Sequence, residues 1–198
     1  KDMEIFGQIK DGRERTGILA YRKEMWKTGE GMKRRLVLKL FSEGMHWRGT
    51  AELLMGRSLQ LSIGAKGTPV PSYSVNIRRH DQIIQLERSA QKWPLFPEKF
   101  SFFIDTTKGP RFYRLRRNVI GIGADYSLYD DRGRKIGKLD HRIINLGGSW
   151  IVKVDAAESY AKLEAVLQMF CALLKFNGAA RRHVAKEVEQ LHLGRAVR

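Results

Sequence analysis

The feature that most constrains the fold is an apolar segment near the C-terminus, Val166–Leu174, in which Gln168 is the only polar residue. Helix-forming residues predominate around it from Ala156 to Phe176, so we expect a helix about 30 Å long. In a helix, this segment presents hydrophobic side chains in nearly every direction. Such a helix is buried all round, and in a soluble protein the rest of the chain has to surround it.

Both ends of this helix carry sequence signals. Asp155 followed by Glu158 resembles a capping box with an acidic cap. Asn177-Gly178 supplies a stop. A second segment, Ala179–Leu193, then has apolar residues at helical spacing with charges between them, which predicts an amphipathic surface helix ended by Gly194.

Most of the first 155 residues alternate with a period of two, which places successive side chains on opposite faces of a β-sheet. Tyr73, Val75 and Ile77 show the pattern most clearly, because polar residues flank each of them. The same alternation occurs at Leu59–Ile63 and at Trp47–Leu53. Further expected strands are Leu36–Phe41, Ile83–Glu87, Phe100–Ile104, Arg111–Arg117, Ala124–Tyr129, Lys135–Leu139 and Trp150–Val154.

Turns such as Met55-Gly56-Arg57 and Asp130–Gly133 separate these short strands and indicate an antiparallel barrel or sandwich. No amphipathic helices alternate with the strands, which disfavours a parallel βαβ fold. Ile18–Trp26 fits a helix or a strand. Lys92–Pro97 should be a loop between two halves, because its prolines favour extended backbone and lack ladder donors.

The apolar helix favours the barrel over the sandwich, since a barrel buries it on every side. We therefore predict a mostly β fold, a closed antiparallel β-barrel of about a dozen strands around a central hydrophobic C-terminal helix. The barrel is expected to form one domain over residues 1–178, with its central helix at 156–176. A C-terminal amphipathic helical extension should occupy residues 179–198.

The chain carries 37 lysines and arginines against 21 aspartates and glutamates, a formal net charge of +16. A field of this sign attracts phosphates, nucleic acid or an acidic lipid surface. A basic surface that only keeps the protein soluble has the same composition, so charge alone does not name a partner.

The single cysteine, Cys171, excludes an intrachain disulfide and suits a reducing cytosol. Its apolar neighbours predict a buried, unreactive thiol. The N-terminal charges are not followed by the apolar region of a signal peptide, and the apolar run at Ala165–Leu174 is shorter than the roughly 20 residues that span a bilayer. We expect a cytoplasmic protein without a transmembrane span, with peripheral attachment to the membrane as an option.

Catalytic and metal-binding patterns are not found in the sequence. None of the histidines lies at a recognised ligand spacing from another histidine, a cysteine or a carboxylate, and there is no Gly-x-Ser-x-Gly elbow. Two stretches, Gly121-Ile122-Gly123 and Gly64–Thr68, resemble phosphate loops, but neither opens a helix whose N-terminus would hold the phosphate. They are expected to be a β-bulge and a turn, and we predict no enzyme activity, metal or cofactor.

Basic residues next to aromatic ones are the remaining signal. In Arg111–Arg117, strand alternation buries Tyr113 and Leu115 and sends Arg114 and Arg116 to the opposite face. Exposed arginines also keep strands from aggregating, so the signal does not specify one ligand. The candidate residues for an anionic ligand are Arg114, Arg116, Arg117, Arg134, Lys135 and Lys138, and Lys33-Arg34-Arg35 adds further charge.

Three segments together resemble the tubby C-terminal-like superfamily, which includes the plant LURP-one-related proteins and the phospholipid scramblases. They are Tyr113–Arg117, Tyr126–Leu139 with its Asp-x-x-Gly and Ile-Gly, and Trp150–Val154 leading into the apolar helix. The resemblance covers about the last 90 residues and implies a barrel of about a dozen strands around a C-terminal helix. The segment after Gly178 departs from a pattern that usually finishes at the helix.

Tubby binds phosphoinositides through basic residues, and the resemblance makes a similar role an expectation here, although fold similarity alone is a weak basis for function. We therefore expect a non-catalytic basic module for anionic ligands, namely phospholipid or phosphoinositide headgroups or an acidic protein surface. Non-specific nucleic-acid binding is the alternative, and an unrecognised enzyme comes third.

Overall fold

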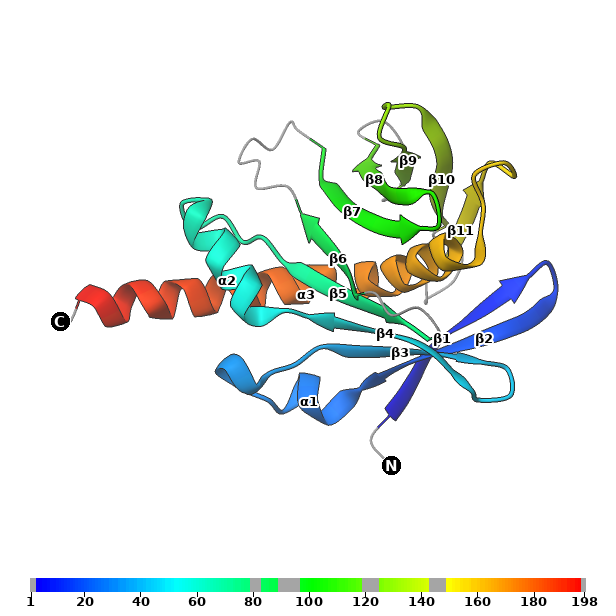
Figure 1. The fold of residues 1–198 in the computed structure, drawn as a ribbon. Coiled ribbons are helices and arrows are strands. Elements are labelled where there is room, and N and C mark those ends of the chain that lie inside the picture. The colour runs from blue at the N-terminus through cyan, green and yellow to red at the C-terminus, as the bar shows by residue number, and fades with distance from the viewer. Residues whose placement is uncertain (1–2, 79–82, 89–96, 119–124, 143–148, 197–198) are drawn as a thin grey trace.

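The computed structural model describes residues 3–78, 83–88, 97–118, 125–142 and 149–196 (Figure 1). Its strands are β1 (Met3–Asp11), β2 (Glu14–Arg22), β3 (Val37–Ser42), β4 (Trp47–Leu53), β5 (Ser72–Ile77), β6 (Ile83–Arg88), β7 (Lys99–Thr106), β8 (Gly109–Arg117), β9 (Tyr126–Tyr129), β10 (Lys135–Arg142) and β11 (Ser149–Val154). Its helices are α1 (Lys23–Lys27), the short 3-10 helix η1 (Gly31–Lys33), α2 (Met55–Gly64) and α3 (Ala161–Ala196).

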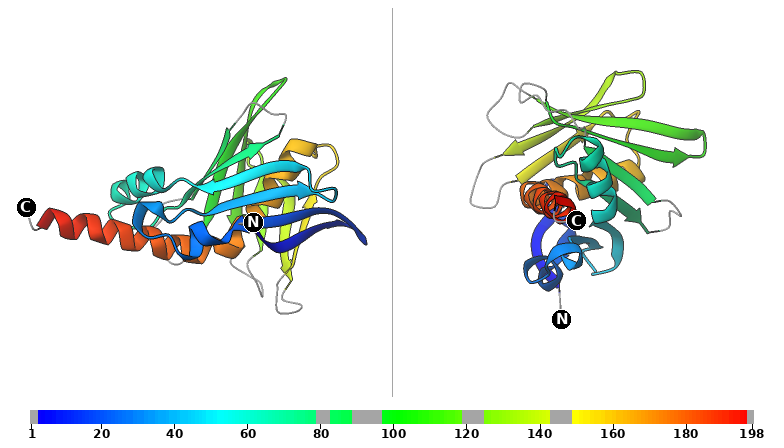
Figure 2. Two further views of the ribbon diagram at one scale, coloured as in Figure 1. Left: turned by 90° about the horizontal axis from the view of Figure 1, so that it is seen from below. Right: turned by 90° about the vertical axis from the view of Figure 1, so that its left-hand side faces the viewer.

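All eleven strands form one sheet in chain order, and each pairs antiparallel with the next. The sheet curves around α3, which is seen along its axis with strands around it in the right-hand view of Figure 2. Among the described residues, β1 and β11 are the two edges of this sheet and do not pair with each other. The mostly β antiparallel fold with a C-terminal apolar helix is therefore confirmed, whereas the sheet is not closed into the predicted barrel.

The apolar helix has different ends from those predicted. It begins at Ala161, because Asp155 and Glu158 form a turn closed by a 2.8 Å backbone hydrogen bond, so the predicted capping box is wrong. It also continues through Asn177 and Gly178, so the expected stop does not exist. The predicted core helix at 156–176 and the amphipathic helix at 179–193 are one helix, α3, whose C-terminal part projects beyond the sheet (Figure 2).

The predicted strand at Leu59–Ile63 is wrong, because this segment belongs to α2, and Met55-Gly56-Arg57 begins that helix instead of forming a turn. Ser58 and Ser62, which were expected on the solvent-exposed face of a strand, are buried, and their hydroxyls accept hydrogen bonds from backbone N–H groups of the following segment. Ser58 accepts a hydrogen bond from the backbone N–H of Ser72 at 2.9 Å, and Ser62 accepts one from that of Val70 at 2.9 Å. Short runs of alternating polarity do not exclude a helix when such serines pack against a neighbouring segment.

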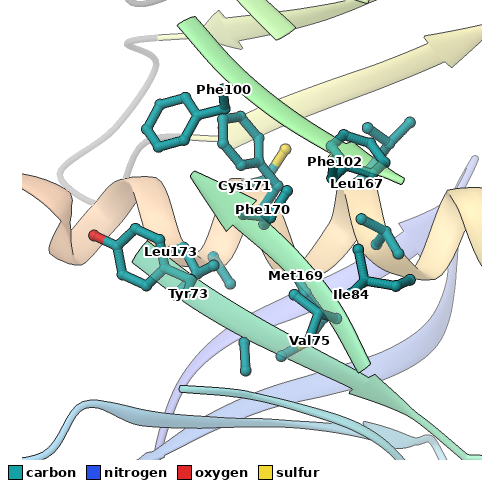
Figure 3. Packing of buried hydrophobic residues seen from close by; sticks show 14 of the residues in the cluster. Tyr73, Val75, Ile84, Phe100, Phe102, Leu167, Met169, Phe170, Cys171 and Leu173 are labelled. Atoms are coloured by element: carbon teal, nitrogen blue, oxygen red, sulfur yellow. The ribbon is translucent and has the colours of Figure 1, made fainter. Parts of the chain in front are cut away.

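The core lies between the concave face of the sheet and the first half of α3 (Figure 3). Leu167, Phe170 and Cys171 are buried as predicted, whereas Leu174 is only partly buried. The ring of Phe170 packs edge-on against Phe100 of β7, with 4.9 Å between the ring centroids. Burial on all sides is therefore confirmed for the middle of the apolar segment, and the side chains become more exposed where α3 leaves the sheet.

A second, smaller apolar cluster joins α2 to the projecting part of α3. It consists of Met55, Val184 and Val188, with Leu59 packed against them. In the described part of the chain, Ala161–His192 has the length and composition of a membrane span, but 61% of its most apolar 18-residue window is buried inside the molecule. The core helix of a soluble protein passes the same test, so this is weak evidence for a span.

Other local predictions have clear outcomes. Ile18–Trp26 is the end of β2 followed by α1, so it is partly strand and partly helix. Asp130–Gly133 forms the predicted tight turn between β9 and β10, and Gly133 has the expected positive φ of 76°. Gly64–Thr68 includes a turn, with positive φ at Lys66 and Gly67. The predicted loop at Lys92–Pro97, except for Pro97, and the predicted bulge at residues 121–123 lie outside the described residues.

Candidate functional site

Basic side chains form a row across the outer face of β7–β11. The strand register places Lys99 opposite Arg116, Arg116 opposite Ser127, Ser127 opposite Lys138, and Lys138 opposite Lys153. Residues directly opposite one another in neighbouring strands share a face of the sheet, so four of these five positions carry positive charge on one face. We call Lys99, Arg116, Lys138 and Lys153 the basic row.

A second row runs parallel to the basic row. Ser101 lies opposite Arg114, Arg114 lies opposite Tyr129, and Tyr129 lies opposite Lys135. The intervening residue on β8, Leu115, is fully buried on the concave side, which fixes Arg114 and Arg116 on the outer face. Both arginines are exposed, as the alternation predicts.

Two aromatic rings lie on the same outer face beside these cations. Phe103 of β7 pairs with Phe112 of β8, their ring centroids are 5.0 Å apart, and Phe103 is 57% exposed. The guanidinium of Arg114 lies 5.4 Å from the ring centroid of Phe112. A hollow of about 360 Å³ is lined by Lys99, Ser101 and Arg114 together with Phe112. The surface thus combines cations with apolar rings.

The acidic residues next to this hollow are held by other partners. Glu87 pairs with Arg57 at 3.0 Å on the side of α2. Arg88, which also lines the hollow, pairs with Glu98 at 2.6 Å, and both of these side chains are about nine-tenths buried. Lys99 and Arg114 form no ion pair with any carboxylate in the described part of the chain, so their charges are available to a ligand.

The other predicted site residues are in different settings. Lys138 forms ion pairs with Asp140 and, at 3.9 Å, with Asp125, which reduces its charge in the basic row. Lys135 is exposed. Arg117 lies opposite Tyr126 and therefore alternates onto the opposite face from Arg116, although its side chain is exposed. The six predicted residues are thus not one cluster.

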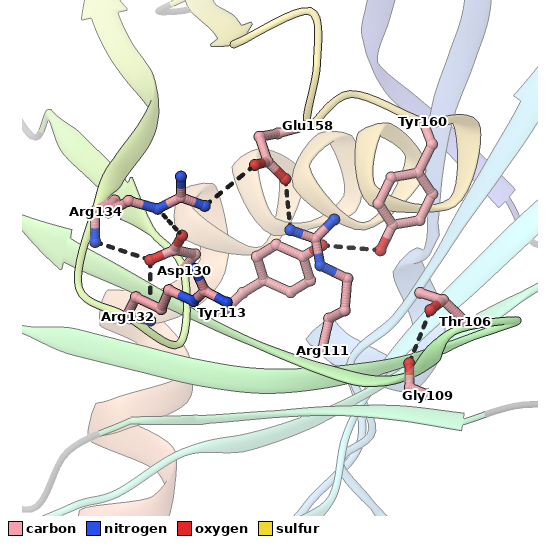
Figure 4. A network of polar contacts seen from close by, with 9 residues as sticks. All are labelled: Thr106, Gly109, Arg111, Tyr113, Asp130, Arg132, Arg134, Glu158 and Tyr160. Carbon is pink, nitrogen blue, oxygen red and sulfur yellow. Dashed lines mark hydrogen bonds and ion pairs between the residues drawn. The ribbon is translucent and has the colours of Figure 1, made fainter.

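Arg134 belongs to a polar network that fastens the start of α3 to the sheet (Figure 4). Its guanidinium pairs with Asp130 at 2.7 Å and with Glu158 at 3.4 Å. Glu158 also pairs with Arg111 at 2.5 Å, and the hydroxyls of Tyr113 and Tyr160 are 3.1 Å apart. Because its charge is matched by two carboxylates, Arg134 is better placed to stabilise the β9–β10 turn than to bind a ligand.

The Asp130 carboxylate shows the strength of this network. Burial would raise its pKa, but hydrogen bonds from the backbone N–H and guanidinium of Arg134 outweigh the burial and hold the pKa below its ordinary value. The carboxylate also accepts a 3.0 Å hydrogen bond from the backbone N–H of Arg132. Asp130 is therefore a charged anchor of the turn.

A second buried polar network lies between the sheet and the middle of α3. The Glu98 carboxylate accepts hydrogen bonds from Tyr126 at 2.7 Å and from Asn177 at 3.2 Å, in addition to its pair with Arg88. Burial would raise the Glu98 pKa, but these donors outweigh it, and the pKa is lowered. The same burial raises the pKa of the Tyr126 hydroxyl, which therefore stays protonated and keeps donating.

No group of three or more histidine, cysteine or acidic side chains suited to a metal ion occurs among the residues that the structure describes. Cys171 is buried, and burial raises the pKa of its thiol, which leaves no thiolate nucleophile there at neutral pH. No family model matches the chain, and no curated protein or solved structure matches it either.

Sequence reasoning missed several residues of this surface. Lys99 and Lys153 join the predicted arginines only through strand register, which cannot be derived from one sequence when the loops between strands are of unknown length. Phe103 was assigned to a strand, but its exposure next to Phe112 depends on which strand pairs with β7. Alternation within Phe100–Ile104 is the signal that places Phe103 on the outer face.

Proposed function

We propose that this chain is a non-catalytic module that binds membranes containing anionic phospholipids through the outer face of β7–β11. The observation that carries the proposal is the combination of Lys99, Arg114 and Arg116 with the exposed Phe103–Phe112 pair on one face. Cations near an anionic membrane surface contribute about 1 kcal/mol each. Aromatic rings at the same level enter the interface between headgroups and acyl chains.

The phosphate groups of the lipids are expected to lie over the hollow next to Lys99 and Arg114, and the edge of Phe103 should enter the lipid. An acidic protein surface would use the same cations, but it would not need an exposed ring beside them. The rings therefore favour the lipid over an acidic protein.

Non-specific binding to single-stranded nucleic acid is the second candidate, because it also combines cations with aromatic rings on which bases stack. Phe103 and Phe112 contact each other with their planes tilted by 54°, so the two rings do not present parallel faces on which successive bases could stack. We therefore rank nucleic acid below the lipid surface.

The tubby-like barrel, closed between β1 and β11, is part of the same proposal. The chain order of the eleven strands and the helix on their concave face support it. The contact between α3 and the β1 edge also supports it, because Phe6 packs against Phe176 with 5.2 Å between the ring centroids. If the barrel is closed, the amides of β11 that do not bond to β10 should exchange their hydrogens slowly. Fast exchange of these amides would show that β11 is an open edge.

The lipid proposal is tested by sedimentation with vesicles of phosphatidylcholine alone and with 30% phosphatidylserine added, on the order of the anionic content of a cytoplasmic leaflet. We expect binding only to the anionic vesicles, weakened by salt. The triple variant Lys99→Gln, Arg114→Gln and Arg116→Gln should lose most of it. The matched control, Lys10→Gln, Arg13→Gln and Lys66→Gln, removes the same charge from other elements and should keep it.

The variant Phe103→Ser separates insertion from charge attraction, because it leaves every cation in place. It should weaken binding to anionic vesicles at least several-fold. Equal loss in the two triple variants would mean that only net charge matters, and would contradict the proposed surface. If the unaltered chain prefers single-stranded DNA to vesicles, and Phe103→Ser loses that preference, the surface would be assigned to nucleic-acid binding instead.

A further inference from the structure

A groove of about 750 Å³ lies away from the proposed lipid surface, between the α1–η1 segment and the projecting part of α3. One wall is the loop around Gly29 and Gly31. The other wall is a single stripe of α3 that includes Arg182, His183 and Lys186. The volume is in the range of small-molecule sites, which are usually about 300–1,000 Å³.

Cationic side chains face this groove from both walls. Lys27 and Arg34 contribute from the α1–η1 segment, and Arg182 and Lys186 contribute from α3. Arg182 and Lys186 are four residues apart on the helix, where like charges destabilise it. Neither they nor Lys27 form an ion pair with a carboxylate within the described ranges.

Arg34 is oriented in advance. Its Nε donates a 2.9 Å hydrogen bond to the carbonyl oxygen of Trp26, and its guanidinium carbon lies 4.3 Å from the centroid of the Trp26 ring. Stacking and the hydrogen bond fix the plane of the guanidinium, which reduces the conformational entropy lost when a ligand binds.

Two carboxylates, Glu30 and Glu187, also line the groove. Four cations against two carboxylates leave a net formal charge of +2 while His183 is neutral. Glu187 is 8% exposed, its Oε1 lies 3.8 Å from Nδ1 of the buried His183, and its Oε2 lies beside Gly31 of the other wall. The rim formed by Arg182 and Lys186 keeps its positive charge.

No large aliphatic or aromatic hydrocarbon side chain occurs among the described residues that line the groove, and the neighbouring Trp26 is buried at 5% exposure. A ligand with a large apolar body would find no surface to cover. A compact polyanion would instead meet two cations on each wall, and two linked phosphates offer one phosphate group to each pair. From this geometry we infer that the groove binds a diphosphate group, held between Arg34 and Lys27 on one wall and Arg182 and Lys186 on the other.

The diphosphate has two possible sources, an inorganic polyphosphate or a nucleoside diphosphate. Isothermal titration of the full chain with pyrophosphate, tripolyphosphate and ADP distinguishes them, and citrate serves as an anion of similar charge without phosphate. Saturable binding of pyrophosphate and tripolyphosphate, but not citrate, is the expected result. Tighter binding of ADP than of pyrophosphate would assign the nucleotide as the source, and exclusion of ADP would assign the inorganic chain.

The double variant Arg182→Gln and Lys186→Gln should weaken pyrophosphate binding at least tenfold. The control Lys10→Gln and Lys108→Gln removes two charges from exposed sites on β1 and on the β7–β8 turn, and it should bind as the unaltered chain does. Both exchanges are on exposed side chains, so both proteins should fold. Failure of all three phosphates to bind, or equal loss in the two variants, would overturn the inference.

His183 supplies a readout inside the groove. Burial lowers its pKa, and the charges of Arg34 and Lys186 lower it further, whereas Glu187 and a contact with the backbone of Gly31 raise it. A bound diphosphate adds negative charge beside the ring, so the pKa of His183 measured by NMR should rise when pyrophosphate is added. An unchanged His183 titration at saturating pyrophosphate would place the anion elsewhere and contradict the groove.

Discussion

The Tyr73 hydroxyl on β5 donates a 2.9 Å hydrogen bond to the side-chain oxygen of Asn177 on α3. Asn177 in turn donates a partly buried hydrogen bond to the Glu98 carboxylate, so one amide bonds on both sides. The link occurs at the point where α3 begins to leave the sheet. The position of the helix along its axis is thus set by hydrogen bonds, in addition to apolar packing.

Replacing Glu98 with Gln should cost about 3 kcal/mol of unfolding free energy, because it leaves the buried Arg88 without a counter-charge. Urea unfolding followed by circular dichroism measures the change. The control Glu87→Gln breaks the more exposed pair with Arg57 and should cost less than about 1 kcal/mol. Similar losses for the two variants would mean that Glu98 does not carry a buried charge.

The same carboxylate predicts an acid dependence. The folded-state pKa of Glu98 is below its ordinary value of 4.5, so its contribution is present above that pH and is lost as the pH falls through the lower folded value. The stability difference between the unaltered chain and Glu98→Gln should therefore be constant near neutral pH and shrink below about pH 4.5. A constant difference down to pH 3 would contradict the lowered pKa.

Gly178→Ala should stabilise the protein by about 0.5–1 kcal/mol, because this glycine is inside a helix and lacks positive φ. An added Cβ would have the guanidinium tip of Arg182 as its nearest neighbour, at 3.8 Å. If α3 instead ended at a left-handed Gly178, the same exchange would destabilise the protein. Thermal unfolding distinguishes the two signs.

Phe170→Ala should cost about 3–5 kcal/mol, since it removes a ring that contacts both Phe100 and Tyr126. Leu174→Ala, on the next turn of α3, should cost roughly 1 kcal/mol, because its side chain is only partly buried. Chemical denaturation of the two variants gives the comparison. Equal losses would mean that the sheet also covers the helix at Leu174.

Gly133→Ala should destabilise the β9–β10 turn by about 1–2 kcal/mol, because φ at this position is 76° and an L side chain is strained there. The Cβ would meet no atom within 4 Å apart from its own residue and its two chain neighbours, so the loss comes from local backbone strain alone. Gly133→Asn should recover some of the stability, since asparagine tolerates this conformation best after glycine. Equal stability of the Ala and Asn variants would remove the backbone explanation.

The strands from β3 to β11 and the buried middle of α3 could be predicted because each carries its own period and burial pattern. The strand predicted at Leu59–Ile63 failed for a tertiary reason, since Ser58 and Ser62 bond to the following segment and make a helix with a polar, buried side. The stop at Asn177 failed similarly, because its side chain is used by Tyr73 and Glu98 across the core.

The site was predictable only in part. Alternation identified Arg114 and Arg116, but it could not show that Asp130 and Glu158 neutralise Arg134. Glu158 is 24 residues away from Arg134 in the sequence. The groove on α3 also could not be predicted, because it exists only if the helix continues beyond Gly178. Lys33-Arg34-Arg35 was recognised as basic, and its contribution to a groove depends on the fold around Trp26.

The order of elements along the chain has a consequence for synthesis. Every strand pairs with its immediate neighbour in sequence, so hairpins can form locally as the chain emerges, and topology of this kind favours fast pairing. The helix that fills their concave side, α3, follows all eleven strands in the sequence, so it is synthesised after them. Until it arrives, the growing sheet presents an uncovered apolar surface, which is the state most prone to aggregation. The sheet thus gains its stable core only when α3 packs against its concave face.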